Sequence, residues 1–247
     1  GMHSVRIANP GVMRVHLRGS AASLGQEVPP AGVSALAGVK ADFKLTSAAS
    51  DAERRKAAAN WMTNPANPLF SRVIVNRIWH HHFGQGLVKK PSDFGAGGGR
   101  PSNPELLDWL GGWFQQNNYS PKSLHRLIVT SRTYRQSSAS RPDALGLDRD
   151  NRLLWRFAPK RLEGEAVRDS LLQAAGMLNT QQSGPSYEDV KEIHFNAGRY
   201  YHLIEVKGPK FDRRTIYRFS PRGERDAILD TFDCPDPSAT APTRAVT

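Results

Sequence analysis

The feature that most constrains the fold of this chain is the stretch from Asn67 to Gly84, NPLFSRVIVNRIWHHHFG. Asn67 and Pro68 form a helix-start signal, because asparagine caps helices and proline is tolerated at the first helical position. Gly84 supplies the matching stop signal. The predicted helix is apolar on nearly every side, and helices of that kind are usually buried. Its polar side chains then need partners, so we expect a polar core around it.

The polar side chains of this helix fall on two stripes. At 100° per residue, Arg72, Asn76 and His80 share one stripe, and Arg77 and His81 share the other. We expect these stripes, rather than the histidine run, to meet acidic residues elsewhere in the chain.

Three consecutive histidines, His80 to His82, suggest a metal site at first sight. Successive helical residues point about 100° apart, whereas helical metal ligands stand three or four residues apart. No HExxH motif occurs in the chain. We therefore predict no metal site, and we interpret His82, which falls on an apolar face, as a hydrogen-bonded core histidine.

A glycine-rich segment, Asp93 to Arg100, precedes a second helix-start signal. Backbone N–H groups of such a loop can hold an anion. The dinucleotide fingerprint fails because Arg100 stands at its third glycine position, and the P-loop fails because no GK[ST] follows. A tight connecting loop is the favoured interpretation, with Asp93 turned inward to pair with Arg72 or Arg77.

Periodicity and capping signals predict the remaining elements. Further helices are expected at 50–62, 103–118, 120–138 and 161–178. Alternating residues predict a strand within 12–19, and β-branched and aromatic residues predict a hairpin between 199–206 and 213–220. The predicted fold class is therefore mainly α: an irregular helical domain with a small accessory antiparallel β-sheet or hairpin.

We divide the chain into three parts on this pattern. Residues 1–49 form an irregular N-terminal segment with one strand, and residues 50–184 form the helical core. Residues 185–247 form a β-hairpin and an extended C-terminal segment, which we expect to pack on the same domain.

Composition limits the possible functions. The chain has 34 Lys and Arg against 23 Asp and Glu, a net charge of +11, which is compatible with binding nucleic acid or anionic polysaccharide. The basic residues are spread out, however, with no run of five or six, which favours internal pairing. No apolar run approaches the roughly 18 residues of a membrane helix, so no membrane insertion is expected.

The single cysteine, Cys234, excludes a disulfide framework and a thiolate metal site. The CxxCH motif is missing, so this chain cannot attach a c-type haem by itself. No cofactor is therefore expected in the chain.

Two sets of polar residues remain as candidates. Arg161, Glu165, Arg168 and Asp169 lie on one side of a predicted helix, where they form either a surface salt-bridge ladder or a buried network that joins this helix to the one at Asn67–Gly84. For catalysis no complete signature is present, and His125, His82 and Asp93 are the candidate residues. Whether the chain is an enzyme stays open.

Four segments together resemble one protein family: RVIVNRIWHHHFGQGLV, DFG…PSNPELLDWL, YSPKSLHRLIVTSRTYRQSS and RLEGEAVRDSLL. This family is the planctomycete-specific, cytochrome-associated domain of unknown function, found in large exported proteins beside cytochrome-c-like haem domains. The resemblance is dense from Asn67 to Ser138 and good again from Arg161 to Leu178. It departs from the family at the unusually glycine-rich DFGAGGGR and at 185–212. The positions on the family motif are Arg72, Asn76, Arg77, Trp79, Phe83, Gly84, Asp93, Phe94, Gly95, Pro101, Pro104, Glu105, Leu106, His125, Tyr134, Arg135, Glu165, Arg168 and Asp169.

The resemblance implies an extracytoplasmic module, periplasmic or secreted, of a multidomain polypeptide whose haem lies in a neighbouring domain. Family members continue beyond the sequence that ends at Thr247, so we expect a truncation there. The leading hypothesis is a non-catalytic structural or docking module whose partners are other domains of the same polypeptide. Its polar core is expected to comprise Arg72, Asn76, Arg77, Asp93, His125, Glu165, Arg168 and Asp169. The alternatives are an enzyme, hydrolase or redox, with a His/Asp site, and a binder of anionic polysaccharide or nucleic acid through its basic surface.

Overall fold

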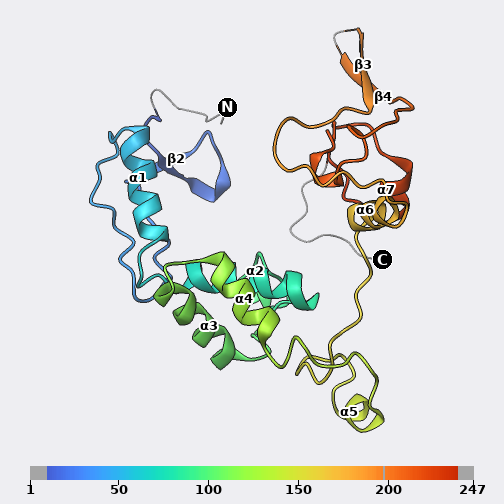
Figure 1. Ribbon diagram of the computed structural model, residues 1–247. Helices are drawn as coiled ribbons and strands as arrows, with labels where there is room; N and C mark the ends of the chain where they lie inside the picture. The colour runs from blue at the N-terminus through green and yellow to red at the C-terminus, as the bar shows by residue number, and fades with distance from the viewer. Residues whose placement is uncertain (1–9, 197, 239–247) are drawn as a thin grey trace. The chain divides into compact units, whose positions relative to one another are not determined.

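The computed structural model describes residues 10–196 and 198–238 (Figure 1). The chain divides into two compact units, residues 1–158 and residues 159–247. The division falls inside 50–184, the range that the sequence analysis assigned to one helical core.

Unit 1 contains five of the described α-helices and unit 2 contains two. Unit 1 contains β1 (Arg14–His16), β2 (Leu24–Glu27), α1 (Asp51–Met62), α2 (Pro68–Phe83), α3 (Pro104–Gln116), α4 (Pro121–Thr130) and α5 (Pro142–Leu147). Unit 2 contains α6 (Gly164–Ala174), β3 (Val190–Phe195), β4 (Gly198–Leu203) and α7 (Ala227–Thr231). Short 3-10 turns occupy Leu17–Gly19, Ala96–Gly98 and Thr215–Tyr217. Across the described residues this makes seven α-helices and two two-stranded antiparallel sheets, which confirms the predicted mainly α class.

The predicted helix starts are confirmed by their caps. The Asn67 side chain accepts from the Leu69 N–H, Pro68 is the first residue of α2, and Gly84 ends the helix in the left-handed conformation. Ser50 and Glu53 form a capping box at α1, and Asn103 and Ser120 cap α3 and α4.

The apolar core of unit 1 lies between α2, α3 and α4. It consists of Val75, Trp79, Phe83, Leu87, Val88, Leu107, Leu110, Phe114, Leu124 and Ile128. Five of these positions lie on α3 and α4, where they are spaced three or four residues apart along each helix. α2 therefore lies at the centre of unit 1 and positions its polar side chains against both neighbouring helices.

Two strand predictions need correction. The N-terminal strand shortens to Arg14–His16 and pairs with β2, in a segment expected to be a loop. The hairpin joins β4 to β3, with Ile193 opposite Tyr200, and not to 213–220. The turn between the two strands includes Asn196, which has a positive φ of 47°. Asparagine tolerates this left-handed conformation better than most residues. Within the described residues, none of the helices has the length and hydrophobicity required to span a membrane.

Candidate functional site

Asn76 makes the most deeply buried polar contact of α2, with a side chain that is 0% exposed. Its amide nitrogen donates to the Val88 carbonyl at 3.0 Å, and its amide oxygen accepts from the Val88 N–H at 2.9 Å. Gly86 lies against this pair, because a Cβ there would come within 2.5 Å of the Val88 carbonyl oxygen. Asn76 thus holds the segment that follows α2 against the helix. Position 86 in this segment has room only for glycine.

The two arginines of α2 have surface partners. Arg72 Nη2 lies 2.6 Å from Asp108 Oδ1 on α3, with both side chains partly exposed. Arg77 is exposed, and its Nη2 lies 3.5 Å from Ser92 Oγ, at the long end of the hydrogen-bond range. The expected pair of Asp93 with either arginine is not formed within residues 10–196, because Asp108 and Ser92 take its place.

Asp93 instead holds the glycine-rich loop together. Its Oδ1 accepts from the Gly95 N–H at 3.0 Å. A Cβ at Gly97 would lie 2.9 Å from Asp93 Oδ2, and one at Gly98 would lie 1.7 Å from the Asp93 carbonyl oxygen. The loop closes tightly on Asp93, which is what the interpretation as a connecting loop predicts.

His82 of α2 and His125 of α4 form a pair that the sequence analysis did not predict. His82 Nε2 lies 2.7 Å from His125 Nδ1, and the Tyr134 ring stands edge-on to His82 at 5.4 Å between centroids. His82 is half-buried and His125 is exposed, so water reaches the pair. One ring donates its N–H and the other accepts it, which allows the pair to take up or release a proton. That is the minimum requirement of general acid–base chemistry.

The histidine run diverges as the helical geometry predicts. The His80 and His81 rings lie 5.6 Å apart at an interplanar angle of 74°, while His82 turns to His125. In the described parts of the chain, no group of three or more His, Cys, Asp or Glu residues is arranged to hold a metal ion.

In unit 2, Arg168 and Asp169 bind α6 to the segment 211–215. Arg168 donates to the carbonyls of Phe211 and Arg213 at 2.7 and 3.0 Å and to Thr215 Oγ1 at 3.2 Å. Asp169 accepts from the Thr215 N–H and hydroxyl, both at 2.7 Å. The Arg168 and Asp169 side chains are only 19% and 17% exposed, so these two residues form a mostly buried network inside unit 2.

Arg161 and Glu165, which the sequence analysis grouped with Arg168 and Asp169, contact the C-terminal part of unit 2. α6 begins only at Gly164, so Arg161 precedes the helix and pairs with Asp233 at 3.3 Å. Cys234 Sγ lies 3.6 Å from Glu165 Oε1. Arg161 therefore does not lie on α6 itself.

Several buried polar residues of unit 2 escaped the sequence analysis. Arg213 donates to the carbonyls of Pro185 and Ser183 at 2.8 and 2.5 Å. Arg218 Nε donates to Asp189 Oδ2 at 2.7 Å, and the Arg218 side chain is 4% exposed. The partners stand about 30 residues away in sequence, so no local spacing signals them.

Tyr187 lies among these arginines and is fully buried. Burial raises the pKa of its hydroxyl above the ordinary value, and the nearby Arg168 cation opposes the rise. Tyr187 therefore stays neutral at physiological pH and contributes packing rather than charge.

The fold and these contacts together define a class: a mainly helical, two-unit protein in which Asn76, Arg168 and Asp169 hydrogen-bond the backbone of their own unit. A family model described as PSD1, protein of unknown function (DUF1553), matches residues 54–247. The chain belongs to this family. Comparison with curated proteins and comparison with solved structures each found no match.

Proposed function

We propose that this chain is a non-catalytic structural and docking module of a longer exported polypeptide. One observation carries the proposal: the motif residues with the best hydrogen-bond geometry stabilise backbone of the same unit. Asn76 satisfies both backbone groups of Val88, and Arg168 and Asp169 satisfy the segment 211–215. Side chains engaged in this way are not available to bind and orient a substrate.

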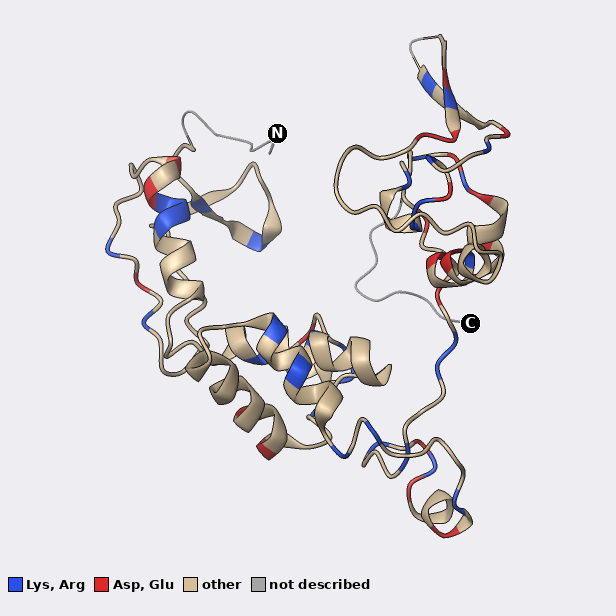
Figure 2. Cartoon of the chain, viewed as in Figure 1, with Lys and Arg blue, Asp and Glu red and all other residues tan. Residues whose placement is uncertain are grey.

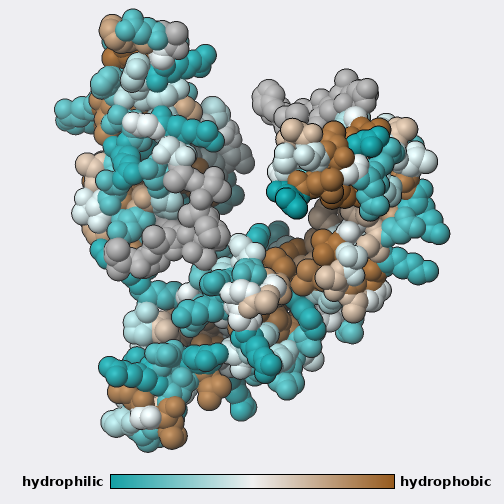
Figure 3. All heavy atoms as spheres, turned by 180° about the vertical axis from the view of Figure 1, so that it is seen from behind, coloured by the Kyte–Doolittle hydropathy of each residue, from teal (hydrophilic) through white to brown (hydrophobic). Residues whose placement is uncertain are grey.

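The hairpin of unit 2 supplies the docking surface in this proposal. Ile193 and Tyr200 are a cross-strand pair, so their side chains lie on the same face, and Phe195 follows two residues later on that face. These side chains are 40%, 52% and 64% exposed. On the face of the molecule seen in Figure 3, hydrophobic residues gather in several patches among hydrophilic ones. Clustered apolar residues on a strand pair favour contact with another protein domain.

The resemblance to planctomycete cytochrome-associated proteins supplies the proposed partner, a haem-bearing domain of the same exported polypeptide. Haem would belong to that neighbour, because this chain lacks CxxCH. Fractionation of native cells, with the haem absorption band followed together with this polypeptide, tests the proposed location and cofactor. Recovery of the polypeptide in the cytoplasm without haem contradicts both.

Titration of this chain with the separately expressed remainder of its polypeptide tests docking. Tethered domains have effective concentrations in the millimolar range, so a Kd of about 1 mM or tighter is expected. Phe195→Glu should weaken association at least tenfold, since a buried charge without a partner opposes docking. Leu147→Glu, at an exposed leucine of α5, is the matched control and should leave the Kd unchanged. Absence of association near 1 mM overturns the proposal.

An enzyme is the second candidate, and the His82–His125 pair is the observation that favours it. A water-accessible imidazole pair has the proton-transfer capacity that a hydrolase or redox site uses. If the complete polypeptide turns over a substrate and His125→Ala abolishes turnover while the fold is kept, the non-catalytic proposal fails.

Binding of anionic polysaccharide or nucleic acid rests only on the net charge. Lys and Arg are dispersed over both units and do not form one continuous stripe (Figure 2). Retention on heparin that disappears only at high salt would favour this candidate.

A further inference from the structure

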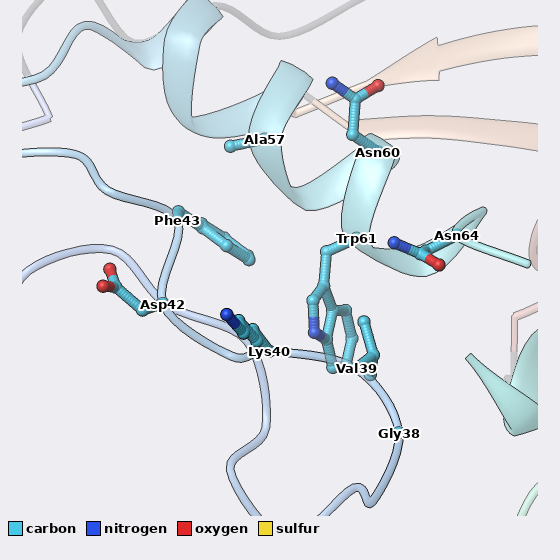
Figure 4. A pocket seen from close by; sticks show the side chains of 9 residues that line it. All are labelled: Gly38, Val39, Lys40, Asp42, Phe43, Ala57, Asn60, Trp61 and Asn64. Atoms are coloured by element: carbon cyan, nitrogen blue, oxygen red, sulfur yellow. The ribbon is translucent and has the colours of Figure 1, made fainter. Parts of the chain in front are cut away.

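A pocket of about 450 Å³ lies within unit 1, between the loop at 38–43 and one face of α1 (Figure 4). Ala57, Asn60 and Trp61 line it from α1, where spacings of three and four residues place them on one side of the helix, and Asn64 lines it from just beyond the helix end at Met62. The volume falls in the range of small-molecule sites, which is about 300–1,000 Å³. The loop residues precede position 54, where the family match begins, so the pocket combines matched and unmatched sequence.

Two aromatic rings form the apolar part of the pocket. The Phe43 and Trp61 rings lie 6.5 Å apart at an interplanar angle of 56°. Gly32 supports the indole from outside, because a Cβ there would come within 2.5 Å of Trp61 Cε2. This close support fixes the indole plane, so the ring presents a preformed flat surface.

Two asparagines, Asn60 and Asn64, line the pocket. Asn64 Oδ1 accepts from the Ala66 N–H at 2.8 Å, which fixes the orientation of its amide, and Figure 4 shows the Asn64 nitrogen on the Trp61 side. Asn60 is exposed one helical turn earlier. A side-chain amide both donates and accepts hydrogen bonds, so the Asn64 amide beside the Trp61 ring suits a ligand that presents hydroxyl groups.

The charged residues that line the pocket argue against an anionic ligand. Lys40 and Asp42 are the only charged residues lining the pocket in the described chain, and their formal charges cancel. Asp42 Oδ1 is also engaged, accepting from the Lys44 N–H at 2.7 Å. A site for phosphate or another polyanion would carry a surplus of positive charge, which this pocket lacks.

We propose that this pocket binds a sugar ring of an uncharged oligosaccharide. A pyranose ring has an apolar C–H face that packs against an indole and a rim of hydroxyls that donate and accept hydrogen bonds. Trp61 supplies the flat apolar surface, and Asn64 binds the hydroxyls. This binding is independent of the docking proposed for the unit 2 hairpin.

Titration calorimetry of the full chain with cellohexaose, xylohexaose, mannohexaose and heparin hexasaccharide tests the proposal. At least one neutral hexasaccharide should bind with a Kd of about 1 mM or tighter. Trp61→Ala should weaken this binding at least about tenfold, because aromatic anchors dominate binding energy. Trp109→Ala is the matched control, since Trp109 is 55% exposed on α3 and does not line the pocket.

Asn64→Ala keeps the test decisive if Trp61→Ala fails to fold, because Asn64 is an exposed residue that lines the pocket beside Trp61. It should weaken neutral hexasaccharide binding at least about threefold, as expected for a lost hydrogen bond. Three results overturn the proposal: no neutral hexasaccharide binds, binding is unchanged in the pocket variants, or only heparin hexasaccharide binds in a salt-sensitive manner.

Discussion

Replacing Asn76 by alanine should destabilise unit 1 strongly, because two buried backbone groups lose their partners. The Val88 N–H and carbonyl bond the Asn76 amide at 2.9 and 3.0 Å, and Val88 is only 2% exposed. Each unsatisfied buried group costs about 1–3 kcal/mol, so the variant should lose about 2–6 kcal/mol of unfolding free energy. Because alanine is also a better helix former by a few tenths of a kcal/mol, the lower half of this range is the expected result.

Urea unfolding followed by tryptophan fluorescence measures this loss selectively. All five tryptophans (Trp61, Trp79, Trp109, Trp113 and Trp155) lie in unit 1. Asn60→Ala, at an exposed helical asparagine, is the control for helix propensity and should change stability by less than about 0.5 kcal/mol. If Asn76→Ala differs from this control by less than about 1 kcal/mol, the reasoning about Val88 is refuted.

Three smaller effects are also expected. Ser50→Ala removes the cap of α1 and should cost about 1 kcal/mol, measured by the same fluorescence assay; no change would contradict the capping box. His125→Ala should change stability by less than about 1 kcal/mol, because His125 is exposed; a larger loss would mean that its pair with His82 is structural. Hydrogen bonds from Ser238, and then from Arg225, lower the pKa of the Asp236 carboxyl from 3.8 to about 2, and the positive charge of Arg225 adds a smaller contribution. The stabilisation from these contacts is therefore complete above pH 3.8 and is lost as the pH falls through 2. A carboxyl-carbon NMR titration with a midpoint near 4 would contradict this.

Local signals in the sequence were sufficient to predict where α1 to α4 begin, but not every helix end. The helix expected at 120–138 ends at Thr130, and the one expected at 161–178 spans only Gly164–Ala174. Asn67, Pro68 and Gly84 bound α2 because capping depends on residues that are adjacent in the chain. The apolar stripes of α3 and α4 were predictable for a similar reason, since helical periodicity determines which side chains share a face.

Long-range partners could not be predicted in the same way. The partner of Asn76 is backbone, at Val88, and every residue offers the same backbone groups. The His82–His125 contact depends on how α2 and α4 cross, which no spacing in the sequence reveals. Sequence-based reasoning therefore recognised that Asn76 and His82 were constrained without identifying what they contact.

The hairpin shows a further limit. β4 contains two aromatic residues typical of strands, Tyr200 and Tyr201, whereas Lys191 and Glu192 interrupt the apolar residues of β3. Both strands are mostly exposed, so burial does not impose an apolar pattern that would reveal the correct pairing. The segment 213–220 has a more strand-like composition, yet Arg213 and Arg218 are used for buried hydrogen bonds.

The central claim is that motif residues of this family stabilise the fold, and Arg168 tests it most directly. Arg168→Met keeps most of the side-chain length but removes the donors to Phe211, Arg213 and Thr215. Hydrogen–deuterium exchange over 205–220 should then rise at least about tenfold, since breaking a buried network of this kind costs more than about 1.4 kcal/mol. Arg72→Met, which breaks a largely exposed ion pair with Asp108, should change exchange in its own unit by less than about fivefold. Unchanged exchange over 205–220 in Arg168→Met would contradict the account.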